Sequence, residues 1–318
     1  MPLHAEHLPG ALIAPFEQPE GEPLRLRRLA VLGPGLLGGS VALAARERGL
    51  ADEVALWARR AEAVRALSAA GAADVVSSDL SEVVCEAELL VVATPVGALE
   101  DLLRKALPLL PEGAVVTDLC SVKAAVEVAA EAALTATGRD DLAFVGAHPM
   151  AGSDRTGFSH ARANLFEGAR CALTPGVHST TGAISTVDRF WRALGCETLH
   201  LEPAEHDRLV ARVSHVPHLA ASALVNAALG ESADAGRLVG PGFRDSTRIA
   251  AGAPDMWAEI VAENREAVAE ALEGYISELG EMLAKLRDLD NEGVRQLLAD
   301  AQVRRAAVFP PGDSGAEG

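Results

Sequence analysis

The first half of the chain is organised around the stretch from Arg28 to Gly49, RLAVLGPGLLGGSVALAARERG. Its apolar start is typical of a buried strand, and its Ala- and Leu-rich end is typical of a helix that stops at a C′ glycine. Between them Gly33, Gly35 and Gly38 have the spacing G-x-G-x-x-G. In this setting the first glycine permits a tight turn, the second lets the backbone approach a pyrophosphate, and the third lets helix and strand pack closely. The sequence therefore predicts a dinucleotide site.

Strand-like and helical segments continue to alternate up to about residue 201. Apolar strand-like runs are predicted at 53–57, 89–93, 114–117, 143–146 and 198–201, and helical segments separate them. Such alternation is typical of a doubly wound parallel sheet, which binds ligands outside the carboxyl ends of its strands. The fold class predicted for residues 28–201 is thus an α/β domain of the Rossmann type.

Several polar residues follow these predicted strands. Thr94 and Pro95 come after one strand, and Ser121 and Lys123 after another. The segment FVGAHPMAGSDRTGF (144–158) places His148 at a strand end before a proline, which disfavours helix. A histidine in this position, with Asp154 six residues further on, is a candidate general base with an orienting partner.

Beyond residue 201 the pattern becomes helical. Helices are predicted over 204–229, as one helix or a pair kinked at Pro217, over 254–286 and over 291–301. Helices this long and apolar in a small domain usually need a partner, so residues 202–306 are predicted to form an all-helical domain of a homodimer. His215 and His218 lack a third ligand at helical spacing, and no metal site is expected.

Composition excludes several function classes. The formal net charge of −17 argues against binding nucleic acid or an anionic membrane surface. Four cysteines without CxxC pairing indicate reduced thiols in a cytoplasmic protein. Residues 1–27 and 307–318, rich in Pro, Glu and Gly, are predicted to be a disordered arm and tail.

Taken together, these segments resemble the prephenate dehydrogenase family. The matching motifs are GPGLLGGS (33–40), DLCSVK (118–123), GAHPMAGSDRTGF (146–158), NLFEGARCALTP (164–175), HDRLVARVSHVPHLAASAL (206–224) and GFRDSTRIAAGAPDMW (242–257). The resemblance implies a Rossmann domain, a helical dimerisation domain, and oxidative decarboxylation of prephenate to 4-hydroxyphenylpyruvate by NAD or NADP. In that reaction hydride leaves C4 of the ring, the C4 hydroxyl loses its proton, and the ring carboxylate departs as CO₂.

The resemblance also implies roles for individual residues. His148 would take the proton of the ring hydroxyl, and Ser121 would hydrogen-bond that hydroxyl or His148. Arg248 would bind a substrate carboxylate, with Lys123 as a further source of positive charge. The remaining substrate-binding residues would be Ser214 and His218 on the pyruvyl side, Trp257, which is expected to reach the neighbouring subunit's site, and Asp154, which stands where the family usually has Glu.

Cofactor choice depends on the end of the second predicted strand. NAD sites place an acid there to bind the ribose 2′-hydroxyl, and this chain has Ala58 followed by Arg59 and Arg60. With the glycine loop, including Leu36 and Leu37, these arginines complete the predicted cofactor site. We therefore expect NADP to be accepted, with NAD use left open.

Two alternatives concern the activity. The substrate could be arogenate or 4-amino-4-deoxyprephenate, because the residues that would distinguish them cannot be placed from the sequence. The chain could also be a non-catalytic NAD(P)-binding sensor, although its retention of Ser121, His148 and Arg248 together argues against that.

Overall fold

The computed structural model describes residues 24–152, 155–230 and 234–309. Most of the predicted N-terminal arm and part of the predicted tail lie outside these ranges. The chain divides into two compact units, residues 1–265 and 266–318, which are treated separately below. The domain boundary predicted at residues 201–202 stays a prediction.

The first unit is built on one sheet, which within the described residues has eight strands in the order β3-β2-β1-β4-β5-β6-β7-β8. The strands are β1 (Leu26–Leu32), β2 (Ala51–Trp57), β3 (Val75–Ser77), β4 (Leu89–Val92), β5 (Val115–Asp118), β6 (Ala143–Pro149), β7 (Arg170–Pro175) and β8 (Glu197–His200). All pairs are parallel except β6 with β7. The order reverses between β1 and β4, so a ligand is expected at the carboxyl ends of these two strands.

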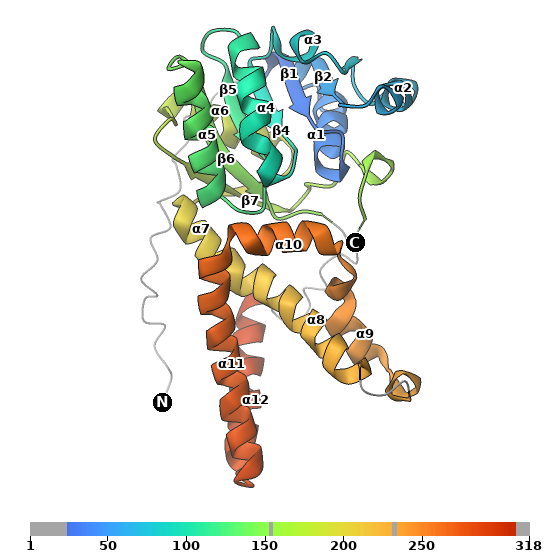
Figure 1. Cartoon of the computed structure of the whole chain (residues 1–318), viewed down its shortest axis with the longest axis vertical. Coiled ribbons are helices and arrows are strands. Elements are labelled where there is room, and N and C mark those ends of the chain that lie inside the picture. Colours follow the sequence, from blue (N-terminus) through green and yellow to red (C-terminus); the bar gives the residue numbers. More distant parts are fainter. Residues whose placement is uncertain (1–23, 153–154, 231–233, 310–318) are drawn as a thin grey trace. The chain divides into compact units, whose positions relative to one another are not determined.

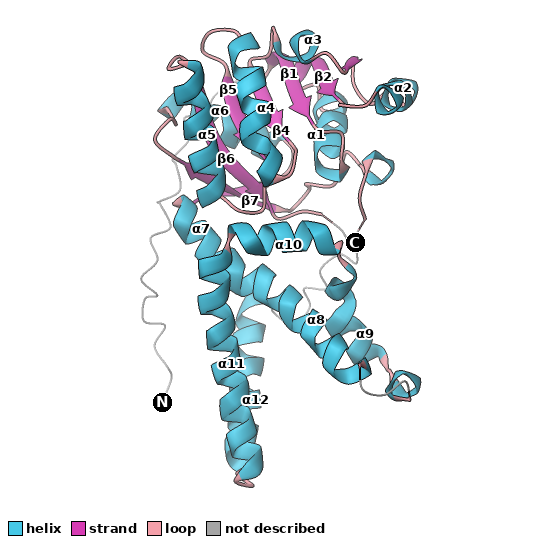
Figure 2. Ribbon diagram, viewed as in Figure 1, coloured by secondary structure: helices cyan, strands magenta, loops and turns pink. Residues whose placement is uncertain are grey.

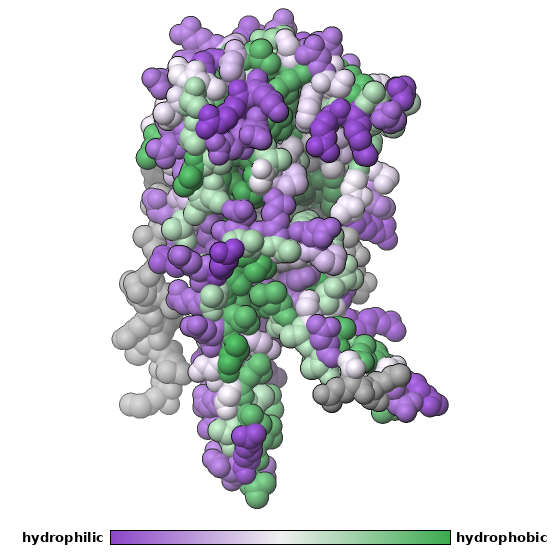
Figure 3. All heavy atoms as spheres, viewed as in Figure 1, coloured by the Kyte–Doolittle hydropathy of each residue, from purple (hydrophilic) through white to green (hydrophobic). Residues whose placement is uncertain are grey.

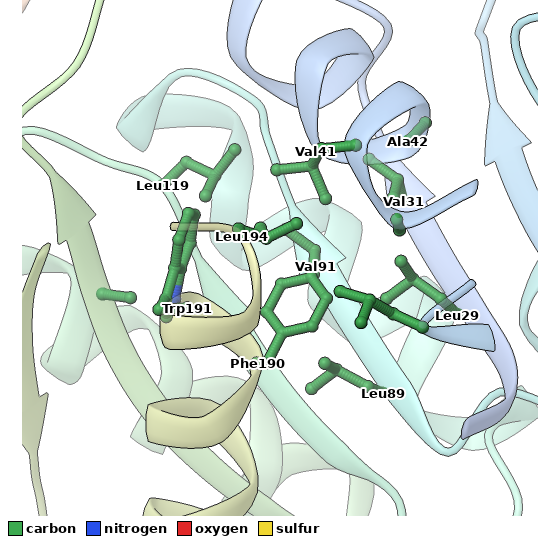
Figure 4. Close-up of a cluster of buried hydrophobic side chains, with 14 of the residues drawn as sticks. Leu29, Val31, Val41, Ala42, Leu89, Val91, Leu119, Phe190, Trp191 and Leu194 are labelled. Carbon is green, nitrogen blue, oxygen red and sulfur yellow. The ribbon is translucent and has the colours of Figure 1, made fainter. Parts of the chain in front are cut away.

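Helices cover both faces of this sheet (Figure 1). Alternate strand residues point to opposite sides, and apolar residues on both sides must be buried. On one face, α1 (Leu36–Glu47), α2 (Ala61–Ala69) and α6 (Thr181–Ala193) bury a cluster that includes Leu29 and Val31. Phe190 and Trp191 of α6 point into this cluster (Figure 4). On the other face, α3 (Leu80–Val84), α4 (Leu99–Ala106) and α5 (Ala124–Thr137) bury Ala30 and Leu32. The predicted doubly wound α/β fold is confirmed.

Two strands depart from the prediction. The edge strand β3 has only three residues, too few for a periodic pattern, and was not predicted. The strand β7 was not predicted either; it runs antiparallel to β6 and pairs Ala172 with His148. Because of this pairing β6 continues to Pro149, so His148 lies within the strand and not after it.

The helical part of the first unit consists of α7 (Pro203–Val210), a π-helical turn at Ala211–His215, α8 (Val216–Leu229), α9 (Pro241–Thr247) and α10 (Pro254–Glu263) (Figure 2). The π-turn comes directly before Pro217, which has no backbone N–H and whose ring would crowd the carbonyl four residues earlier. A wider turn relieves that crowding, and the helical run therefore continues through the proline.

A single helix over residues 254–286 is wrong. Asn264 leaves the helical conformation at φ −110° and ψ 30°, ending α10 before α11 (Arg265–Arg287) begins. Its side-chain amide donates instead to the carbonyl of Asp207 at 2.8 Å. In the second unit α12 (Asn291–Val308) extends past the predicted end at 301. Among the described residues, no helix is long and apolar enough to span a membrane.

Candidate functional site

The glycine loop lies between β1 and α1 and fits a dinucleotide. Gly33 has φ +114°, and a Cβ there would lie 2.4 Å from the carbonyl oxygen of Ala93. A Cβ on Gly38 would lie 2.1 Å from the carbonyl oxygen of Gly33. Gly35 has no neighbour within 4 Å of its Cβ position, so nothing in the described protein requires glycine there. The free space at Gly35, beside a helix N-terminus without an acid in its first turn, suits a pyrophosphate.

The loop after β4 lies beside the glycine loop. The methyl carbon of Thr94 is 3.4 Å from the Cβ position of Gly33. The Thr94 hydroxyl is buried without a hydrogen-bond partner among the described residues, as expected of a group that bonds a ligand. Pro95 follows it and is exposed. The predicted cofactor residues of these two loops therefore lie together at the reversal point of the sheet.

No acid stands at the end of β2. The strand ends at Trp57, whose indole N–H donates to the carbonyl of Ser78 at 3.0 Å. Ala58 is buried, while Arg59 and Arg60 are exposed. Residues 57–60 therefore offer two cations and no carboxylate to a bound ribose.

The backbone of Ala147, directly before His148, is hydrogen-bonded through both its N–H and its carbonyl. Asp118, at the end of β5, accepts a hydrogen bond from the N–H of Ala147 at 3.0 Å. Lys123 donates to the carbonyl of Ala147 at 2.9 Å and forms an ion pair with Asp118. Gly146 makes room for this arrangement, because a Cβ there would lie 2.4 Å from the Thr174 hydroxyl and 3.5 Å from the Lys123 stem.

The burial of Lys123 argues against the substrate-binding role predicted for it. Its side chain is fully buried, as is that of Asp118, and its ammonium group is occupied by Asp118 and by the carbonyl of Ala147. A lysine this deep needs a paired carboxylate, since an unpaired buried charge is very costly. Lys123 contributes by holding the strand that carries His148.

The ring of His148 is held by residues of α7. Its Nδ1 lies 2.9 Å from Nε2 of His206, and Nδ1 of His206 lies 2.8 Å from Oδ1 of Asp207. Asp207 also accepts the backbone N–H groups of Lys123 and Ala124 at the start of α5, at 2.8 and 2.9 Å. His206 and Asp207 are buried, and His148 is partly exposed. Three residues thus form a chain that runs from a helix N-terminus to a partly exposed imidazole.

Burial keeps these histidines neutral. It lowers the pKa of His148 well below its usual value, and the charges of His206, Lys123 and His215 act in the same direction. Burial also lowers the pKa of His206, against the opposing effect of its hydrogen bond to Asp207. For Asp207 burial acts to raise the pKa, but hydrogen bonds from His206 and the α5 backbone outweigh it and keep the pKa low. The result is a neutral histidine pair beside an ionised carboxylate.

A second group of rings lies on α8 and α10. His218 stacks on Trp257 with ring centroids 3.7 Å apart, and His215 meets the edge of Trp257 at 6.1 Å. Gly252 permits this stack, because a Cβ there would lie 2.5 Å from the Trp257 indole nitrogen. Trp257 packs against His218 of its own chain, and its expected reach to the neighbouring subunit's site stays a prediction. Nδ1 of His218 is buried without a partner among the described residues.

The other predicted site residues are placed with fewer contacts. Ser121 lies half-buried after β5, and Ser214 lies half-buried in the π-turn. Arg248 is exposed at the start of the 3-10 helix η6 (Arg248–Ala251), which packs on α8. Asp154 lies outside the described residues. Among the residues that are described, no cluster of three or more His, Cys, Asp or Glu side chains could hold a metal ion.

Asp118, His206, Asp207 and Asn264 are not among the site residues predicted from the sequence. The available signal was an adjacent His-Asp pair near the start of a helix, which is common on helix surfaces and carries little information alone. The contacts that give these residues meaning join α7 to β6, α5 and α10, and no local pattern shows them.

Comparisons with known proteins point to one family. A family model described as "Prephenate dehydrogenase, nucleotide-binding domain" matches residues 41–199, and one described as "Prephenate dehydrogenase, dimerization domain" matches residues 202–300. The chain is 30% identical over 274 residues to a prephenate dehydrogenase of Bacillus subtilis, covering 84% of this chain and 72% of that protein. It is 28% identical over 290 residues to a cyclohexadienyl dehydrogenase of Zymomonas mobilis, covering 89% and 96%.

Solved structures give the same result. A prephenate dehydrogenase from A. aeolicus in complex with hydroxyphenyl propionate and NAD⁺ superposes with a TM-score of 0.82 at 29% identity, covering 89% of this chain and 98% of that one. An arogenate dehydrogenase from Synechocystis superposes with a TM-score of 0.77 at 28% identity, covering 88% and 99%. The likeness therefore extends over both halves of the chain.

Proposed function

Since the chain belongs to the prephenate dehydrogenase family, we propose that it converts prephenate to 4-hydroxyphenylpyruvate and CO₂ with NAD(P)⁺. The observation that carries this proposal is His148, a neutral, partly exposed histidine on β6. Strands β1, β4, β5 and β6 are parallel neighbours, so their carboxyl ends share one edge of the sheet. His148 and the glycine loop therefore face the same side of the domain.

The reaction divides between the cofactor and this chain's own residues. A nicotinamide cofactor held at the glycine loop of Gly33, Gly35 and Gly38 would supply the acceptor for the hydride of C4. His148 accepts the proton of the C4 hydroxyl, and Ser121 orients that hydroxyl. The ring carboxylate leaves as CO₂ while its bonding electrons complete the aromatic ring, and the C4 oxygen regains a proton as it becomes the phenol of the product. Arg248 binds a carboxylate of the substrate, and Ser214 and His218 line the pyruvyl side.

An assay of the purified full chain tests this proposal. Prephenate is supplied with each cofactor, and reduced nicotinamide and 4-hydroxyphenylpyruvate are measured together. We expect equal amounts of both products, and a kcat about 10²- to 10⁴-fold lower in His148→Asn, because general acid–base catalysis contributes about that much. Arogenate and 4-amino-4-deoxyprephenate are assayed in parallel. Turnover of one of these alone would replace the substrate, and no turnover of any would favour a non-catalytic sensor.

For the cofactor, we propose that NADP⁺ is accepted. The proposal rests on the exposed Arg59 and Arg60 and on the lack of an acid over residues 57–60. Guanidinium groups bind a 2′-phosphate, whereas an acid would repel it. We expect Arg59→Ala to lower kcat/KM for NADP⁺ about 10-fold or more, the value of one charged hydrogen bond, with little change for NAD⁺. Arg65→Ala, an exposed arginine further along α2, is the control. Strong NAD⁺ preference unaltered by Arg59→Ala would overturn the proposal.

For the assembly, we propose a homodimer formed through the second unit. Four large apolar residues, Ile276, Leu279, Leu283 and Leu286, are between 46% and 58% exposed and lie on one face of α11. Figure 3 shows hydrophobic surface along this helix. Light scattering should give a mass near twice the chain's 33.0 kDa. Leu283→Glu should shift the protein towards monomer, and Val128→Glu on the exposed face of α5 should not. A monomeric native protein would contradict the proposal.

A further inference from the structure

We propose that His206 and Asp207 are positioning residues that set the tautomer of His148, so that the lone pair of its Nε2 is available to the substrate. The inference rests on the proposed function in one respect, that His148 is the base. The geometry comes from the chain Asp207–His206–His148, whose two links are 2.8 and 2.9 Å long.

The tautomers follow in order from Asp207. An ionised carboxylate only accepts hydrogen bonds, so Nδ1 of His206 must carry the hydrogen that faces it. A neutral imidazole has one N–H, and Nε2 of His206 is therefore an acceptor. Nδ1 of His148 lies against this acceptor and must carry its own hydrogen. Nε2 of His148 is left with a free lone pair, which is the form a general base requires.

The opposite arrangement is excluded by burial. With the hydrogen of His206 on Nε2, its Nδ1 lone pair would face Asp207 Oδ1 inside the protein. Both residues are buried, so no bulk water replaces the lost hydrogen bond, and an unsatisfied buried pair of this kind is costly. Asp207 cannot turn away, because Lys123 N and Ala124 N bind its two oxygens.

The same chain stabilises His148 after it accepts the proton. The imidazolium then donates from Nδ1 to His206, and the negative charge of Asp207 lies beyond His206. The proton stays on His148 until the C4 oxygen takes one back as the ring becomes a phenol, either from His148 or from solvent, which the partly exposed ring can reach. Asp118 and Lys123 hold the backbone before His148, so the ring has both its position and its protonation pattern determined by the fold.

The tautomer can be read directly by ¹⁵N NMR of the histidine side chains, without substrate. In the native protein we expect His148 to be protonated on Nδ1 and not on Nε2. In Asp207→Asn the amide cannot accept both backbone N–H groups that the two carboxylate oxygens accept, so His206 Nδ1 is no longer held opposite a carboxylate, and we expect His148 protonated on Nε2 to appear beside the native tautomer. A native His148 protonated on Nε2 would overturn the inference even if the protein is active. The predicted tautomer without turnover of prephenate would instead contradict only the proposed function.

Kinetics separate positioning from a structural role. Asp207→Asn should lower kcat about 10²- to 10³-fold with little change in KM, a smaller effect than the roughly 10⁴-fold loss known for the same change in a serine protease triad. In a His148→Asn background Asp207→Asn should cause no further loss, since it acts through His148. His206→Gln keeps an acceptor near Nε2 and should retain more activity than His206→Leu. Asp188→Asn, which alters a buried Asp–His contact elsewhere, should leave kcat unchanged.

Two outcomes of these kinetics would overturn the inference. One is an unchanged kcat in Asp207→Asn. The other is an equal further loss in the His148→Asn background, which would make Asp207 only an anchor of α5. If Asp207→Asn does not fold, the NMR of the native protein and the comparison of His206→Gln with His206→Leu still decide the question.

Discussion

Arg248 is exposed at the start of η6, and no carboxylate among the described residues forms an ion pair with it. A guanidinium without an ion-pair partner among the described residues suits a ligand that brings its own carboxylate. Lys123 is the opposite case, because its charge is fully used inside the protein. Arg248 can therefore bind an anionic ligand, whereas the charge of Lys123 is already paired.

We expect Arg248→Ala to raise KM for prephenate about 10- to 100-fold, which corresponds to one hydrogen bond between charged groups. Its effect on kcat should be much smaller, because a bond to a non-reacting carboxylate stabilises ground state and transition state alike. Initial rates over a range of prephenate concentrations measure both constants. Arg237→Ala, an exposed arginine of the 3-10 helix Ala235–Leu238, is the control. An unchanged KM in Arg248→Ala would leave Arg248 without a role in binding.

At the scale of elements, the strand–turn–helix unit β1–α1 uses its glycines for different purposes. Gly33 and Gly38 are required by packing, since side chains there would meet backbone atoms of Ala93 and Gly33. Gly35 is adjacent to them in the motif and has free space around its Cβ position. Close approach of a pyrophosphate to the backbone would explain glycine at that position.

This difference predicts opposite effects of the same substitution. Gly35→Ala should leave the melting temperature nearly unchanged and raise KM for the cofactor, because the new methyl group fills space needed by the pyrophosphate. Gly38→Ala should lower the melting temperature by about 2 to 10 °C, as expected for overpacking of about 1 to 3 kcal/mol in a protein of this size. Differential scanning fluorimetry and cofactor titration provide both readouts. An unchanged cofactor KM in Gly35→Ala would remove Gly35 from the site.

Across the whole molecule, four histidines share one electrostatic property. Burial lowers the pKa of His148, His206, His215 and His218, and for His215 the value falls to about 4. Above the unfolded value of about 6.5, folded and unfolded chains both keep these groups neutral, and the histidines have no effect on stability. As the pH falls through this value, the unfolded chain binds protons that the folded chain does not. Unfolding is therefore favoured by acid.

We expect the free energy of unfolding to decrease between pH 6.5 and 5, before most carboxylates titrate. Each such histidine contributes at most about 1.4 kcal/mol per pH unit. Urea unfolding at several pH values measures the slope. His215→Asn keeps an acceptor for Asn264 and should make the slope shallower, whereas His160→Asn at an exposed position should not. A stability that does not change over this range would contradict the lowered pKa values.

The sequence by itself determined the doubly wound sheet and the cofactor loop. Apolar periodicity and glycine spacing are local properties, and the backbone of a tight turn or a buried strand depends on few neighbours. Motif likeness also indicated the family, and with it His148. The ends of elements were less well determined where contacts with distant residues decide them, as at Asn264 and in the β6–β7 pair.

Only the tertiary structure decided how His148 is held. His206 lies 58 residues from His148 in sequence, and Asp207 lies 84 residues from the backbone N–H of Lys123 that it binds. These groups meet because α7 packs against α5 and β7. Hydrogen bonds over such separations depend on exact packing, whereas the hydrophobic pattern only requires that a side chain be inside or outside. For this reason the sequence predicted that Lys123 contacts the substrate, whereas in the fold it is buried and bonds Asp118 and the carbonyl of Ala147.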